Sequence, residues 1–180
     1  MKKNCCEPNN KKSGVKKLDP FIIGAVLITL VLFAGVIWYG TKTGESVQVE
    51  TSEQVVISTD EKKYDWGTID INSGIVNKTF TIENKGTGVL KLYDVETSCM
   101  CTTAQLITKD KTSKKFGMHD PSYSVFDVQP GESAELLVEF DPIFHGPSGV
   151  GDISRTITIK TNDKNNSELS FNLTAKVIKE

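Results

Sequence analysis

Hydrophobic and polar residues follow two different patterns along this chain of 180 residues. Near the N-terminus, the nineteen residues from Phe21 to Tyr39 include no charged side chain. A helix rises about 1.5 Å per residue, so this stretch would span roughly 28 Å, close to the ~30 Å hydrocarbon core of a bilayer. Trp38 and Tyr39 stand at its C-terminal edge, where aromatic rings favour the membrane interface. The pattern predicts an uncleaved transmembrane anchor over residues 21–40, because a cleaved signal peptide has a shorter apolar region.

Beyond the anchor the hydrophobic pattern changes to a period of two. Leu169, Phe171 and Leu173 alternate with polar residues, and turn signals such as Pro130-Gly131 separate the apolar runs. We expect seven strands, near residues 64–69, 75–83, 89–98, 123–128, 132–140, 153–161 and 168–178. Long insertions would follow the third strand, over 102–122, and the fifth, over 141–152. The fold class predicted is all-β, an Ig-like seven-stranded β-sandwich preceded by one N-terminal transmembrane helix.

Charge divides the chain at the same place. Residues 1–20 hold six lysines against Glu7 and Asp19, whereas residues 41–180 hold 15 basic and 21 acidic side chains. By the positive-inside rule the N-terminus stays in the cytoplasm and the acidic body is extracytoplasmic. The domains expected are a basic cytoplasmic head (1–20), the anchor (21–40), a tether (41–52) and the Ig-like β-sandwich (53–180). No basic stripe marks the body, so we expect no nucleic-acid partner.

Several segments of the body resemble a known family. These are YDWGTI from Tyr64, FTIENKGTGVLKLYDVETSCMCTTA up to Ala104, and the later runs QPGESAELLVEFDP and IKTND. Together they resemble a bacterial family of Ig-like domains of unknown function (DUF fifteen-seventy-three), related to Hydin-type Ig-like modules, over roughly residues 52–178. The most specific piece is the S-C-x-C-T motif at Ser98–Thr102, in which Met100 replaces the glycine common in the family. The resemblance implies an exported β-sandwich and supplies no activity.

Strand parity predicts that the cysteines and histidines of the body lie together. With seven strands, Cys99 and Cys101, the pair Met118-His119, and His145 fall in connections at one end of the sandwich. In an extended strand, Cα atoms of residues i and i+2 are ~6.6 Å apart, so a Cys99–Cys101 disulfide would require a bent backbone. Two thiolates converge on a metal ion more easily. We therefore take as candidate metal ligands Cys99, Cys101, His119, His145 and Met118.

Three functions remain open at this stage. The first is a membrane-anchored exported Ig-like binding or structural module without a catalytic set, with another envelope or surface protein as a candidate partner. The second is a metal-binding domain, with copper favoured over zinc because thioether and thiolate sulfurs suit copper. The third is a thiol redox protein, disfavoured because the spacing is C-x-C and no helix N-terminus lies nearby. We expect no enzyme, since neither a nucleophile–base set nor a phosphate-binding loop is visible.

Overall fold

The chain divides into two units, Met1–Glu45 and Ser46–Glu180. The computed structural model describes residues 20–40, 49–119 and 124–180, so the predicted basic head and most of the tether lie outside the described residues. In the first unit, α1 (Pro20–Gly40) contains no charged residue. Proline suits the first helical position because its missing N–H would have no partner there. Residues Pro20–Ile37 are long and apolar enough to cross a membrane, a test that a signal sequence near an N-terminus also passes.

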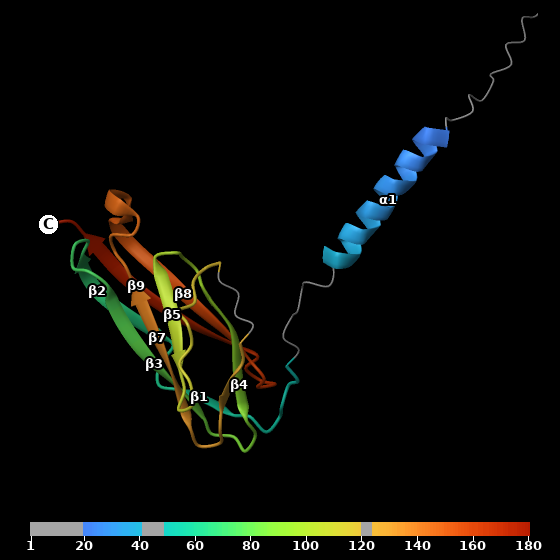
Figure 1. The fold of residues 1–180 in the computed structure, drawn as a ribbon. Coiled ribbons are helices and arrows are strands. Elements are labelled where there is room, and N and C mark those ends of the chain that lie inside the picture. Colours follow the sequence, from blue (N-terminus) through green and yellow to red (C-terminus); the bar gives the residue numbers. More distant parts are fainter. Residues whose placement is uncertain (1–19, 41–48, 120–123) are drawn as a thin grey trace, which may run out of the picture. The chain divides into compact units, whose positions relative to one another are not determined.

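The second unit is a β-sandwich of two sheets (Figure 1). Nine strands are present among the described residues: β1 (Ile57–Thr59), β2 (Lys63–Asp70), β3 (Val76–Asn84), β4 (Leu90–Thr97), β5 (Thr102–Ile107), β6 (Phe126–Val128), β7 (Ser133–Phe140), β8 (Gly151–Thr161) and β9 (Glu168–Ile178). One sheet has the order β1-β3-β7-β5 and the other the order β2-β9-β8-β4-β6. Neighbouring strands are antiparallel except β2, which pairs in parallel with β9.

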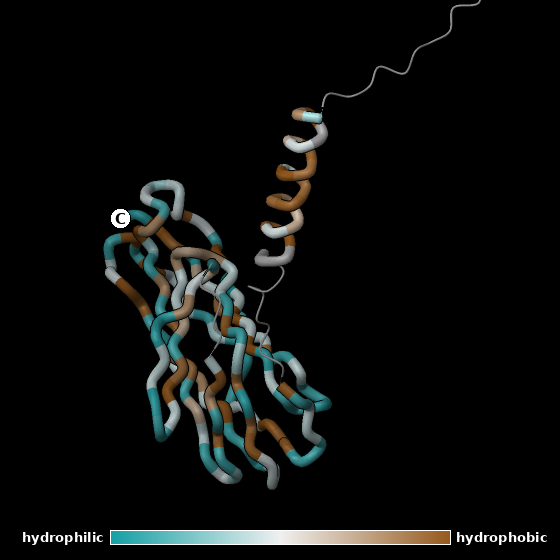
Figure 2. Tube along the Cα trace, turned by 45° about the vertical axis from the view of Figure 1, so that its right-hand side comes forward, coloured by the Kyte–Doolittle hydropathy of each residue, from teal (hydrophilic) through white to brown (hydrophobic). Residues whose placement is uncertain are grey.

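Alternation of side chains along the strands builds the core between the sheets. Apolar residues on the inner face of each strand are buried and alternate with more exposed residues, as period two requires. Phe80 of β3 and Phe171 of β9, one from each sheet, meet with ring centroids 4.9 Å apart. Figure 2 shows the same contrast along the chain: α1 is mostly hydrophobic, whereas the strands mix hydrophobic and hydrophilic positions.

The all-β sandwich class is confirmed, but the strand count of seven is wrong for the described residues. The two missing strands are β1 and β5. β1 has three residues, too few for a pattern to be recognised. β5 lies inside the segment that we treated as an insertion, because its inward positions include Thr102 and Ala104, which read as weakly hydrophobic.

The extra strand β5 does not change which end of the sandwich each later loop reaches. After β5 the chain turns back, and isolated bridges pair Ile107 with Thr112 and Ala104 with Phe116. The segment 112–116 therefore runs antiparallel beside β5, so β5 and this return segment add two passes and preserve the parity. The connections that precede β3, follow β4 and follow β7 lie at one end of the sandwich, called here the sulfur end.

Candidate functional site

A short turn between β4 and β5 positions both cysteines of the sandwich. The hydroxyl of Thr97 lies 3.1 Å from the carbonyl oxygen of Cys99 and 3.0 Å from that of Thr102, and the Thr102 N–H donates to Cys99 O. The neighbouring Ser98 exchanges hydrogen bonds with Thr156 of β8, through its own N–H and through its hydroxyl oxygen. These contacts close the turn and attach it to both sheets.

The structure joins Cys99 and Cys101 in a disulfide. Their Cα atoms are 5.3 Å apart, within the range that a disulfide bridges and shorter than the spacing along an extended strand. The turn supplies the bent backbone that such a bond requires. The expectation of two separate thiols therefore differs from the structure, because the strand ends at Thr97, before the first cysteine.

Each sulfur has its own nitrogen neighbour. Nε2 of His145 lies 3.3 Å from Sγ of Cys99, and Nε of Arg155 donates to Sγ of Cys101 at 3.1 Å. Arg155 is half-buried, with its guanidinium carbon 5.5 Å from the centroid of the Phe140 ring. Burial lowers the pKa of the Arg155 guanidinium from its ordinary value, but an arginine keeps its charge in a protein. The two sulfurs therefore have different surroundings, an imidazole beside one and a cation beside the other.

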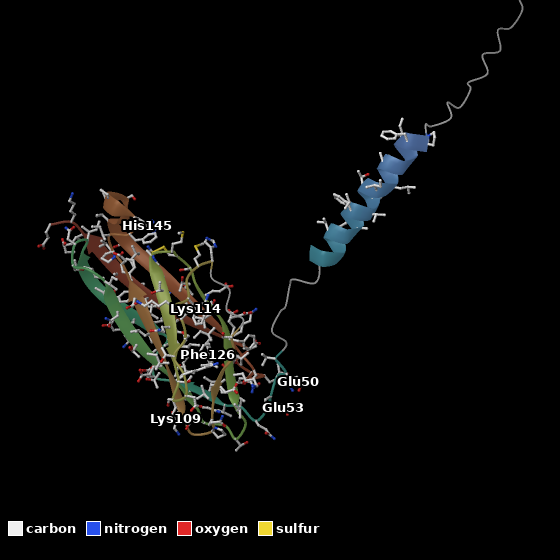
Figure 3. The ribbon with its side chains drawn as sticks, viewed as in Figure 1. Glu50, Glu53, Lys109, Lys114, Phe126 and His145 are labelled. Carbon is white, nitrogen blue, oxygen red and sulfur yellow. A yellow bond between two sulfur atoms is a disulfide. The ribbon has the colours of Figure 1, made fainter. Side chains whose placement is uncertain are left out.

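The two cysteines also differ in burial. Cys101 is 3% exposed and packs in an apolar cluster with Ile69, Phe140 and Val177. Cys99 is half-buried, and His145 beside it is exposed. His145 precedes the short 3-10 helix η1 (Gly146–Gly149) in the connection between β7 and β8, and its carbonyl accepts a hydrogen bond from Ser148 Oγ at 2.7 Å. Figure 3 labels His145 at this end of the sandwich and Lys109 at the opposite end.

Three of the five candidate ligands form one group. The ligand atoms of Cys99, Cys101 and His145 all lie within 4.8 Å of one another. His119 is not part of this group, and both it and Met118 are exposed in the turn that follows Phe116. Cys₂His is a donor set that fits a soft or borderline metal ion once the sulfurs are thiolates.

Arg155 is the site residue that the sequence analysis missed. It lies in β8 at position i+2 from Ile153 and i−2 from Ile157, so the alternation places it on the inward face with these isoleucines. A cation at an inward position of a strand is unusual, because a buried charge requires a partner. That break in the pattern was the signal available in the sequence.

Exposed apolar side chains surround the disulfide. A pocket of about 210 Å³ beside it is lined by Ile75, Met100, Cys101 and Phe144 together with polar residues that include Glu139 and Lys115. Glu139 and Lys115 form an ion pair, and Thr103 Oγ1 lies 3.2 Å from the Glu139 carboxylate. Met100 is 57% exposed and Ile75 60% exposed, although both are large and hydrophobic. We call Ile75, Met100 and Phe144 the apolar rim.

Residues 57–115 match the model of a family described as "Protein of unknown function (DUF1573)". The match includes β1 to β5 and both cysteines of the sulfur end. It confirms the family resemblance seen in the sequence, over this part of the chain. No curated protein sequence matches the chain.

Solved structures share the fold. A protein of unknown function from Porphyromonas gingivalis W83 is 20% identical, with a TM-score of 0.53 and an alignment over 73% of this chain. This chain spans about half, 51%, of that protein's length. An ASH / PapD-like domain of human CEP192 is 14% identical, with a TM-score of 0.45 over 77% of this chain and 96% of that domain. The E. coli chaperone DraB is 10% identical, with a TM-score of 0.39 over 68% of this chain and 56% of that one. The first of these similarities shows the β-sandwich fold and no activity.

Proposed function

We propose that the protein is a membrane-anchored binding module whose β-sandwich is extracytoplasmic. The apolar length of α1 supports the anchor, and the six lysines on its N-terminal side support a cytoplasmic head. The test is labelling of intact cells with a maleimide that does not cross membranes, in a chain without its native cysteines. A single cysteine introduced at exposed Ser170 should be labelled. A single cysteine kept at position 5 should not be labelled. Labelling at position 5 alone would reverse the orientation.

We further propose that the module, with its cysteines reduced, binds one soft metal ion, copper(I) before zinc, through Cys99, Cys101 and His145. The observation that supports it is the clustering of three ligand atoms within 4.8 Å, two from the β4–β5 turn and one from the β7–β8 connection. Two thiolates and one imidazole suit a metal of borderline or soft character, and a bound metal would hold the turn and the β7–β8 connection together. The disulfide and the metal site are alternative states of the same two sulfurs: two electrons reduce the disulfide, and the metal binds the two sulfurs as thiolates, without their protons.

Anaerobic titration of copper(I) against a competing chelator tests the metal site. All proteins are full-length, in detergent, reduced beforehand, and contain Cys5→Ser and Cys6→Ser so that only the sandwich thiols remain. We expect one ion per chain in the parent, loss of binding in Cys99→Ser/Cys101→Ser, and at least about tenfold weaker binding in His145→Ala. The matched control His119→Ala should bind as the parent does. Equal copper stoichiometry in the parent and the double serine variant would remove the proposal.

A second candidate function, thiol redox exchange, is favoured by the disulfide itself. The bond joins cysteines two residues apart, one sulfur half-buried and the other buried beside a guanidinium. A disulfide of this kind closes almost no loop, so it adds little to stability through the entropy of the unfolded chain. Reduction of the folded parent by dithiothreitol, measured as the release of two thiols per chain, tests this candidate. A pair that reacts only after unfolding would remove it.

A further inference from the structure

The geometry points to a direction of thiol–disulfide exchange at the sulfur end, an inference that rests on the thiol redox candidate. We propose that the disulfide accepts two electrons from a dithiol of another protein. The incoming thiolate attacks Sγ of Cys99, and Cys101 leaves with its charge stabilised by Arg155. The partner docks against the apolar rim.

Access decides which sulfur is attacked. A thiolate must approach one sulfur along the line of the bond that breaks, so the attacked sulfur has to be reachable from solvent. Cys99 is half-buried at the surface of the turn, whereas Cys101 is 3% exposed within the apolar cluster of Phe140, Ile69 and Val177. Cys99 is therefore the more exposed of the two cysteines, and the side chain beside its sulfur, His145, is itself exposed.

The sulfur that leaves, Cys101 Sγ, is the one with a guanidinium beside it. Nε of Arg155 is 3.1 Å from Sγ of Cys101, in a partly desolvated setting where a charge-assisted hydrogen bond is stronger than in water. As the Cys99–Cys101 bond breaks, its electron pair moves to Cys101 Sγ and negative charge develops there. A leaving thiolate that is stabilised in place departs faster. The guanidinium is thus positioned for the step.

The exchange balances in two displacements. In the first, the partner thiolate bonds to Cys99, the intramolecular disulfide breaks, and the Cys101 thiolate takes a proton from solvent. In the second, the partner's other thiolate attacks its own sulfur in the mixed disulfide and releases Cys99. The partner dithiol is oxidised to a disulfide, the Cys99–Cys101 pair is reduced to a dithiol, and two electrons and two protons are transferred in total.

The apolar rim identifies the reductant as a protein dithiol on a hydrophobic surface. Ile75, Met100 and Phe144 come from two different connections and the cysteine turn, yet they line one pocket with Cys101. Exposed large hydrophobic side chains grouped around a reactive bond favour a partner that buries them. Glu139 in the same pocket is paired with Lys115, so Asp141 gives the pocket a net negative charge, which disfavours a small anionic thiol such as glutathione.

Single-cysteine variants test which sulfur is attacked. In full-length protein with Cys5→Ser and Cys6→Ser, the Cys101→Ser variant keeps only Cys99, and Cys99→Ser keeps only Cys101. We expect the Cys99 thiol to form a mixed disulfide with 5,5′-dithiobis(2-nitrobenzoate) at least about tenfold faster than the Cys101 thiol in the folded proteins. Both should react equally in urea. Equal or reversed rates in the folded state would overturn the assignment of Cys99.

The guanidinium is tested by the rate at which the folded parent disulfide is reduced by dithiothreitol. Arg155→Gln should slow it about five- to tenfold, and Arg155→Lys should restore part of the rate because the cation is kept. Lys160→Gln, in the same strand but paired with Asp94, is the matched control and should reduce as the parent does. If dithiothreitol reduces Arg155→Lys as slowly as it reduces Arg155→Gln, the electrostatic role is overturned and a packing role remains.

A third comparison separates docking from chemistry. The reductants are dithiothreitol, glutathione, and a synthetic peptide with two cysteines flanked by leucines. Phe144→Ser and Met100→Gln should slow reduction by the peptide about fivefold more than they slow reduction by dithiothreitol. Equal effects on all three reductants, or reduction by glutathione as fast as by the peptide, would overturn the protein-dithiol partner. Failure of every reductant on the folded parent would instead remove the thiol redox candidate on which this inference rests.

Discussion

The two ends of the sandwich differ in some of the side chains that they bury and expose. At the end away from the sulfurs, polar side chains are buried: Asn84, Asn162 and Asp163 are almost fully inaccessible to solvent. At the sulfur end, hydrophobic side chains are exposed instead, as in the apolar rim of Ile75, Met100 and Phe144.

The buried polar residues are fully used in holding the loops. Nδ2 of Asn84 donates to the carbonyls of Gly88 and Val128, and Asn162 accepts from the Lys91 N–H and donates to Val89 O. Among the residues that the structure describes, no buried side-chain nitrogen or oxygen lacks a hydrogen-bond partner. The comparison teaches that burial of polar groups at one end is structural, whereas exposure of the apolar rim at the other favours a role in binding.

The largest effect on stability is expected at the end away from the sulfurs, called here the polar end, where two backbone segments approach closely. A Cβ at Gly86 would overlap the carbonyl oxygen of Gln54 and lie 2.6 Å from the Val56 nitrogen. Gly86→Ala should therefore displace the segment before β1 and lower the free energy of unfolding by about 3 kcal/mol. Urea unfolding of the full chain in detergent measures it. The exposed neighbour Thr87→Ala is the control, and equal stability of the two variants would contradict the close approach.

The second-largest effect on stability is expected from loss of the buried side-chain amide of Asn84. Asn84→Ala removes two donated hydrogen bonds and one accepted from the Gly86 N–H, and leaves the carbonyls of Gly88 and Val128 without that partner. We expect a loss of about 2–3 kcal/mol in the free energy of unfolding. The same urea experiment measures it, and a loss under about 0.5 kcal/mol would break the proposed distinction between the ends.

Acid should lower the free energy of unfolding, because Asp163 at the polar end becomes protonated. Burial by itself raises the pKa of Asp163, but hydrogen bonds from Asn166 Nδ2 and from the Asn165 N–H outweigh it, so the pKa lies below its ordinary value. A lowered folded-state pKa contributes stability above the unfolded-state pKa, and that contribution is lost as pH falls below about 4. The stability difference between the parent and Asp163→Asn should shrink between pH 6 and pH 3. A difference independent of pH would contradict this role.

The smallest effect is expected at the sulfur end. Phe144→Ser and Met100→Gln remove exposed side chains, so the free energy of unfolding should change by less than about 0.5 kcal/mol. Together with the Asn84→Ala result, this sharpens the contrast between the ends. A loss above about 1.5 kcal/mol in either variant would show that the apolar rim supports the fold, and its exposure would then need no binding partner.

The sequence predicted most of the sandwich, because alternation is strong where both sheets bury aliphatic residues. It placed β7, β8 and β9 within a few residues of their observed limits, since runs such as Leu169, Phe171 and Leu173 admit one register only. It missed β5, whose inward positions Thr102 and Ala104 are polar or small, leaving only Leu106 as a large apolar residue, and which pairs with the return segment 112–116. Pairing with a later segment leaves no local pattern.

The candidate site was predicted in part. Strand parity brought His145 to the cysteines correctly, because it depends only on how many times the chain crosses the sandwich. The bond between Cys99 and Cys101 depends on where β4 ends, and strand ends are set by hydrogen bonds such as those of Thr97 that sequence patterns do not encode. Arg155 was missed because its role depends on a sulfur 54 positions away in the chain.

The parallel pairing of β2 with β9 bears on how the protein is made. Tyr64 lies opposite Leu173, so the first strand of the larger sheet meets its neighbour only when residues 168–178 have left the ribosome. Until then Lys63–Asp70 has no β9 beside it, and contacts of such long sequence separation form slowly. The larger sheet therefore assembles only after β9 (Glu168–Ile178) has been made, and a chain that stops at Ser170 should be aggregation-prone rather than a smaller stable domain.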